Sequence, residues 1–248
     1  MSQASDTMRR GWKINDAKRD AGLTTPDDIQ RFDDIQYGPD PVENKLDVYR
    51  PKNAQGKIPV IVSVHGGGWV YGDKELYQFY GMTLAQRGFA VVNFTYRLAP
   101  EVKFPAPLED TNNVINWMYE NQEEYGLDMN HVFMVGDSAG GHLCGLYSAI
   151  CTNPEYAVNY TFKVPDGFVP QAVALNCGAY NPFSKEGVLG DEQDQELMED
   201  FLPEKGSAKE RALVNVTDHV TENFPPVYLM TCVGDFCRPQ APLLAVSY

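Results

Sequence analysis

The feature that most constrains this chain is a tight strand-to-helix turn near its middle. The apolar run 131–134 leads directly into the sequence Val-Gly-Asp-Ser-Ala-Gly-Gly, residues 135–141. A G-x-S-x-G pattern between an apolar strand and a helix start rich in small residues is typical of a nucleophile elbow, which exposes a serine hydroxyl. Gly136 and Gly140 have no Cβ that would collide across such a turn. The pattern therefore predicts a strand, Ser138 at the apex of the turn, and a helix.

Strands and helices alternate on both sides of this turn. Continuous apolar runs, separated by segments whose apolar residues have helical spacing, indicate parallel strands joined by helices. The predicted strands are 31–37, 45–49, 58–64, 89–96, 131–135, 172–176 and 227–233, and the predicted helices are 6–23, 74–87, 107–125, 139–150, 191–201, 207–214 and one after Pro239. The expected fold class is α/β, a mostly parallel sheet with helices on both faces.

The length of 248 residues fits one large α/β domain. We expect a single domain over residues 1–248, in which residues 1–25 form an N-terminal cap helix. The basic side chains of that helix are either a docking patch or a solvent-exposed face. Residues 179–223 interrupt the alternation of strands and helices, and this insertion fits a cap over the site as well as a surface decoration.

Composition excludes several classes of partner. A net charge of −14 argues against binding to nucleic acid and to anionic membrane surfaces. No apolar run approaches the roughly 20 residues of a membrane span, and the first residues lack the apolar segment of a secretory signal. The five cysteines have no zinc-binding spacing. We therefore expect a cytoplasmic protein with reduced thiols and with neither metal nor cofactor.

A glycine-rich loop follows the predicted strand 58–64, with the sequence His-Gly-Gly-Gly-Trp from His65. Glycines let the backbone approach a substrate closely and turn its N–H groups inward. Together with the N–H of Ala139, the N–H groups of Gly66 and Gly67 are predicted to form an oxyanion hole. A phosphate-binding loop is excluded, because the pattern G-x-x-x-x-G-K-[ST] is absent.

The sequence offers an acid for this site but no base. Asp235 follows the predicted strand 227–233, at the strand end where open α/β sheets place their sites. In elbow enzymes the chain order is serine, acid, histidine. The chain contains four histidines, all before the acid: His65, His131, His142 and His219. We expect His142 to pack beneath the elbow.

A third motif, Tyr-Arg-Leu-Ala-Pro-Glu at 96–101, lies between the glycine loop and the elbow. With these three motifs in order, the chain resembles the hormone-sensitive-lipase-like branch of the α/β-hydrolases, which includes bacterial carboxylesterases. The resemblance covers about residues 30 to 240. It implies an eight-stranded, mostly parallel sheet and ester hydrolysis through an acyl-enzyme on Ser138, without a cofactor. It also implies that the region of Arg97 and Glu101 supports the site; from the residues alone, these two form a structural ion pair.

The resemblance further implies that the base histidine lies one helix and one strand beyond the acid. The sequence ends at Tyr248, so we expect this chain to lack the last strand and helix of the fold together with that histidine. An uncovered sheet edge is prone to pairing with another chain. We therefore expect a homo-oligomer that forms through the C-terminal end.

The expected substrate is a small-molecule ester with a short acyl group. Trp69, Tyr71 and Tyr180 are candidate walls of the substrate pocket, although each aromatic ring fits the core equally well. Two other functions remain open. The same site would serve a small N-acyl amidase or formamidase, and a hydrolase fold without its base would serve as a non-catalytic ligand-binding protein.

Overall fold

The computed structural model describes residues 1–184 and 192–247, and within them one sheet has seven strands in the order β1-β2-β4-β3-β5-β6-β7. The strands are β1 (Ile29–Gln36), β2 (Lys45–Pro51), β3 (Ile58–Val64), β4 (Ala90–Phe94), β5 (Leu127–Asp137), β6 (Ala172–Asn176) and β7 (Val227–Met230). The pairs β1–β2 and β2–β4 are antiparallel, and every pair from β4 to β7 is parallel. The mostly parallel sheet is confirmed, and each predicted strand is present.

The helices agree with the prediction in place more closely than in length. They are α1 (Gln3–Arg19), η1 (Lys74–Tyr77), α2 (Gln78–Ala85), α3 (Ala106–Tyr125), α4 (Ala139–Thr152), α5 (Pro154–Ala157), α6 (Glu192–Phe201), α7 (Ala208–Val214), η2 (Val216–Asp218) and α8 (Gln240–Ala245). The single helix predicted over 74–87 is divided into the 3₁₀ turn η1 and α2. The predicted start of α6, Asp191, lies outside the described residues.

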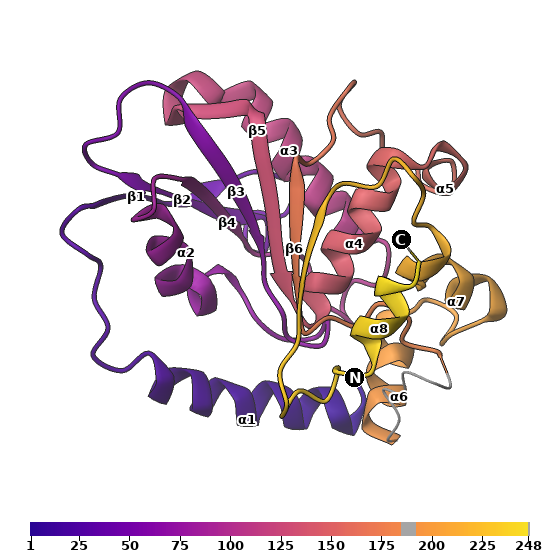
Figure 1. Cartoon of the computed structure of the whole chain (residues 1–248). Coiled ribbons are helices and arrows are strands. Elements are labelled where there is room, and N and C mark those ends of the chain that lie inside the picture. The colour runs from indigo at the N-terminus through magenta and orange to yellow at the C-terminus, as the bar shows by residue number, and fades with distance from the viewer. Residues whose placement is uncertain (185–191, 248) are drawn as a thin grey trace.

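The core forms two layers because side chains alternate across the central strands. Val60, Val62 and Val64 face the layer that contains α3 and α4, whereas Ile61 faces α2 and packs with Met82. Figure 1 shows these helices on opposite faces of the sheet. Because the strands from β4 to β7 are parallel, the loops that follow them lie at one end of the sheet, where α/β folds build their sites.

Helix α1 lies across that end of the sheet, beside α6 (Figure 1). Its Arg9 donates to the backbone oxygens of Val70 and Ala99, at 2.7 and 2.8 Å, in the loops that follow β3 and β4. The side chain of Asp16 accepts a hydrogen bond from the Tyr71 hydroxyl at 2.7 Å. The first helix is therefore attached directly over the strand ends. No helix in the described residues combines the length and the apolar character that membrane crossing requires.

Arg97 and Glu101 do not form the ion pair expected between them. Arg97 is paired with the buried Asp110, at 2.9 Å, and with Glu109. Glu101 is paired with Arg9 of α1 at 2.6 Å. The expectation was wrong because each side chain finds its partner on a different helix, and residue spacing along the chain carries no information about that helix packing.

Candidate active site

Ser138 lies at the apex of the turn between β5 and α4. Its backbone has φ 51° and ψ −120°, a conformation that an L-residue rarely adopts. Its N–H donates to the backbone oxygen of Asn176 at 3.0 Å, which attaches the turn to the end of β6. A Cβ on Gly136 would lie 2.4 Å from the Gly140 oxygen, and one on Gly140 would lie 2.2 Å from the Val64 oxygen. Gly136 therefore permits the turn as the sequence predicted, whereas Gly140 is required because the turn packs against the end of β3 and not because of a collision across the turn.

The glycine loop turns its backbone toward Ser138. Gly67 has φ 125° and Gly68 has φ 57°, and a Cβ on Gly67 would lie 1.9 Å from the Tyr71 oxygen, so no other residue fits there. Within residues 1–184 and 192–247, no acceptor meets the N–H groups of Gly67, Gly68 or Ala139. These three amides are available to an anion.

The prediction for Gly66 needs a correction. Its N–H donates to the hydroxyl of Tyr77 at 3.0 Å, so this donor has a partner inside the protein. The sequence pattern showed that the loop supplies N–H groups, but a side chain from the following 3₁₀ turn decides which of them stay free. Of the three glycines in this loop, Gly67 and Gly68 are the ones whose N–H groups keep no partner among the described residues.

Asp235 and Ser138 line the same cavity, which has a volume of about 300 Å³. The carboxylate of Asp235 accepts from the Thr231 hydroxyl at 2.7 Å and from the Cys237 N–H at 2.9 Å. Strand β7 ends at Met230 instead of continuing to Val233, because the chain turns there: the Asp235 N–H donates to the Cys232 oxygen. This turn brings the carboxylate to the strand end.

His142 packs beneath the elbow, as the sequence indicated. Its Nδ1 accepts from Trp69 Nε1 at 3.1 Å, and its Nε2 donates to the Val214 oxygen at 2.7 Å, so both ring nitrogens are occupied. Complete burial lowers the pKa of His142 to about 4. The ring is a neutral structural link between the helix after the elbow and the insertion.

The other three histidines are also placed elsewhere. His65 donates from Nδ1 to the Gly66 oxygen and stacks on Tyr96, and burial lowers its pKa to about 4. His219 stacks on Tyr156, and His131 contacts Asp128 on the solvent-exposed part of β5. All four histidines are among the described residues, and none of them contacts the Ser138 hydroxyl.

Of the three candidate pocket walls, Tyr71 alone lines the cavity. Trp69 is buried and stacks on Phe201, with ring centroids 5.0 Å apart. Tyr180 is fully buried, and its hydroxyl accepts from the Gly178 N–H at 3.2 Å. The prediction was wrong for these two residues, because aromatic residues next to a site are as easily drawn into the core as into a pocket wall.

Several cavity residues were missed by the sequence analysis. They are Trp12, Asp16 and Arg19 of α1, Tyr77 of η1, Cys177 and Phe236. The residues of α1 carry no motif, and only the docking of the helix brings them to the site. Tyr77 lies twelve positions after His65, in the 3₁₀ turn that follows the glycine loop.

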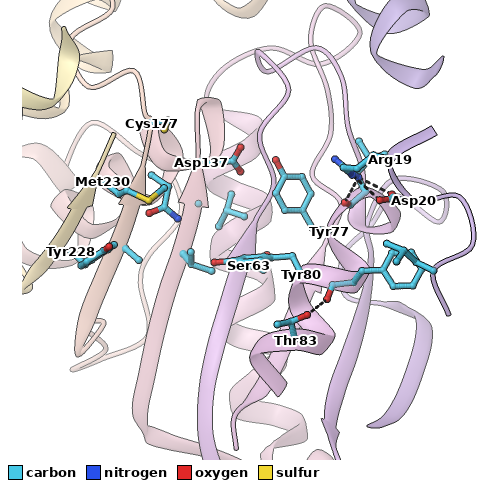
Figure 2. A pocket seen from close by; sticks show the side chains of 18 of the residues that line it. Arg19, Asp20, Ser63, Tyr77, Tyr80, Thr83, Asp137, Cys177, Tyr228 and Met230 are labelled. Carbon is cyan, nitrogen blue, oxygen red and sulfur yellow. Dashed lines mark hydrogen bonds and ion pairs between the residues drawn. The ribbon is translucent and has the colours of Figure 1, made fainter. Parts of the chain in front are cut away.

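A second hollow of about 970 Å³ lies beside the first, over the face of the sheet next to α2. Tyr77, Asp137 and Cys177 line both hollows, and Figure 2 shows the hydroxyl of Tyr77 directed at the Asp137 carboxylate. Burial raises the pKa of Asp137, and the hydrogen bond from Tyr77 opposes this rise. Among the described residues, no group of three or more His, Cys, Asp or Glu side chains is arranged to hold a metal ion.

Comparison with known proteins gives the family. The BD-FAE family model matches residues 46–238. The versiconal hemiacetal acetate esterase of Dothistroma septosporum is 28% identical over 82% of this chain and 64% of its own length. Esterase LipQ of Mycobacterium tuberculosis is 30% identical over 86% of this chain and 51% of its own length. The chain thus spans between half and two thirds of the length of these relatives.

A solved structure agrees with the sequence comparisons. Esterase B from Lactobacillus rhamnosis, inhibited by a tributyrin phosphonate, superposes with a TM-score of 0.87 at 26% identity, over 99% of this chain and 81% of that one. The match extends over the sheet, the elbow and the glycine loop together. This chain has the α/β-hydrolase fold and belongs to the BD-FAE family.

Proposed function

We propose that this protein is a serine hydrolase of small carboxylic esters. The observation that carries the proposal is the position of Ser138: a strained residue at a helix N-terminus, in one cavity with Asp235. Free amide N–H groups on the adjacent glycine loop supply what an oxyanion requires. The relatives in several organisms are named esterases, which supports the same reaction.

In the proposed mechanism, Ser138 Oγ attacks the ester carbonyl carbon while its proton passes to a base. The carbonyl oxygen becomes an anion and accepts from the N–H groups of Gly67, Gly68 and Ala139. Collapse of this intermediate breaks the bond to the alcohol, which leaves with the proton and forms the acyl-enzyme. Water then attacks the acyl carbon, which releases the carboxylic acid product and regenerates the Ser138 hydroxyl.

Asp235 is the proposed acid, which would orient and stabilise an imidazolium during both steps. No histidine of the described residues stands between this carboxylate and Ser138. The cavity of about 300 Å³ under α1 supports a short acyl group. The same atoms would also cleave a small N-acyl amide, which makes an amidase or formamidase the alternative within the same mechanism.

The test measures hydrolysis of p-nitrophenyl acetate by the wild-type protein and by Ser138→Ala, with and without added imidazole. We expect slow turnover, because no histidine of the described residues contacts the Ser138 hydroxyl and removal of the base histidine costs one serine protease about a millionfold. Imidazole should accelerate the wild-type protein beyond its effect on Ser138→Ala, which serves as the blank. Equal rates for both proteins at every imidazole concentration would reject the hydrolase and favour a ligand-binding protein.

We also propose that copies of the chain associate through the C-terminal end. Strand β7 pairs only with β6 among the described strands. Large apolar side chains on and just after this strand are exposed, namely Tyr228 at 64%, Met230 at 39%, Val233 at 89% and Phe236 at 62%. Exposed apolar surface at a sheet edge favours association with a second copy.

A further inference from the structure

The hydroxyl of Tyr77 lies between the glycine loop and the nucleophile elbow. It accepts the Gly66 N–H at 3.0 Å, and it is directed at the carboxylate of Asp137, the residue before Ser138. A phenol oxygen can accept one hydrogen bond while its own hydrogen is directed at another group. One side chain thus connects the glycine loop to the elbow.

The contacts at this connection leave no free space. A Cβ on Gly66 would lie 3.0 Å from the Tyr77 hydroxyl, 3.0 Å from Asp137 Oδ2 and 2.9 Å from the Asp137 backbone oxygen. The loop and the elbow therefore approach each other as closely as backbone allows. Their separation sets the distance from Ser138 to the amides of Gly67 and Gly68, and a shift of about 1 Å in such a distance can cost 100-fold in rate.

The turn that carries Tyr77 is itself held firmly. The side chain of Asp73 caps η1 by accepting from the N–H groups of Glu75 and Leu76. The Lys74 N–H donates to Thr95 Oγ1 at 3.0 Å, and Asn93 Nδ2 donates to the Lys74 oxygen at 2.6 Å. These bonds fix the backbone of η1 to β4 and the residue that follows it, so the phenol is presented from a rigid support.

The charge of Asp137 gives the connection a second role. This carboxylate is mostly buried, and its full negative charge beside the site would oppose an oxyanion. The Tyr77 hydroxyl directed at this carboxylate offsets part of its negative charge, because the phenol hydrogen carries a partial positive charge.

We propose that Tyr77 is a positioning residue for the oxyanion hole. Its hydroxyl fixes the glycine loop relative to the elbow and keeps the amides of Gly67 and Gly68 free for the substrate oxygen. The inference rests on the proposed function, since it assigns Tyr77 a role in acyl transfer at Ser138. Tyr77 itself transfers no proton and forms no bond to the substrate.

The test compares Tyr77→Phe with Tyr80→Phe. Both variants lose one hydroxyl. Tyr80 lines only the larger of the two hollows and is not among the residues that line the cavity with the glycine loop. The readouts are the rate of Ser138 labelling by a p-nitrophenyl phosphonate, followed by intact mass, and amide hydrogen exchange of residues 65–69. Asp137→Asn, which retains an oxygen acceptor for the phenol, is a second variant.

We expect Tyr77→Phe to slow the maximal labelling rate about 10- to 100-fold, with the half-saturating phosphonate concentration unchanged within twofold. The Gly66 amide should exchange at least tenfold faster. Tyr80→Phe should match the wild-type protein, and Asp137→Asn should slow labelling less than Tyr77→Phe. A folded Tyr77→Phe that is labelled at the wild-type rate overturns the positioning role alone. A wild-type protein whose Ser138 is never labelled overturns the proposed function, and the positioning role with it.

Discussion

At the scale of single residues, two glycines decide whether the elbow forms. A side chain at Gly140 would meet the backbone oxygens of Val64 and His65, at 2.2 and 2.7 Å. Backbone atoms of a central strand cannot move aside without breaking the sheet ladder. By contrast, Gly11 in α1 has nothing within 4 Å of its ideal Cβ, so its surroundings do not require a glycine.

Gly140→Ala should therefore lower the free energy of unfolding by about 3 kcal/mol or more, at the severe end of overpacking. Gly11→Ala should leave it unchanged or raise it by up to about 1 kcal/mol, because alanine favours a helix interior over glycine. Urea unfolding followed by circular dichroism measures both. Similar midpoints for Gly140→Ala and the wild-type protein would mean that the elbow has more room than these distances allow.

At the scale of elements, one arginine makes several of the bonds that hold α1 over the strand ends. Arg9 makes bonds to two backbone oxygens and a bidentate pair with Glu101, at 2.8 and 2.6 Å. Arg10, the next residue, has a side chain that is 79% exposed, and among the described residues it pairs only with Asp6 on its own helix. Of these two neighbouring arginines, Arg9 therefore docks the helix, whereas Arg10 is exposed to solvent.

Arg9→Ala should loosen α1, with a cost of about 1–2 kcal/mol in docking after allowance for the solvent exposure of the pair. Arg10→Ala is the matched control and should cost less than about 0.5 kcal/mol. Hydrogen exchange of residues 3–19 gives the readout, and we expect faster exchange in Arg9→Ala alone. Equal exchange in the two variants would show that α1 is held through α6 instead.

At the scale of the whole molecule, the two faces of the sheet are not covered equally. Helices α3 and α4 cover one face, whereas on the other face α2 contacts β2 and β4, and a hollow of about 970 Å³ lies over β5, β6 and β7. Parallel sheets are normally buried on both faces. The exposed part of this face adjoins the β7 edge, where we expect a second copy to pair.

Sedimentation velocity over a hundredfold range of concentration tests this association. The weight-average mass of the wild-type protein should rise with concentration. Tyr228→Lys should shift it toward the monomer, because a charge on an edge strand blocks pairing. Val158→Lys adds the same charge at a residue that is 81% exposed elsewhere and should change nothing. A wild-type protein that remains a monomer throughout would contradict the proposal.

The sequence by itself determined the elements and their order. Apolar runs and helical spacing are local signals, and they placed every strand of the sheet and the turn that carries Ser138. The steric requirement at Gly136 is also local, because its Cβ would collide with the backbone of Gly140, only four residues away, whereas the requirement at Gly140 comes from the end of β3. Order along the chain was enough to bring Asp235 to the same strand ends as Ser138, since parallel strands share one direction.

Only the tertiary structure decided which groups at the site are free. The N–H of Gly66 is taken by Tyr77, and the indole of Trp69 is bonded to His142, which is 73 residues away along the chain. Docking of α1 likewise pairs Arg9 with Glu101, and Arg97 pairs with Asp110 instead. Hydrogen bonds and ion pairs act over a few ångströms in space whatever the separation in sequence, so spacing along the chain cannot predict them.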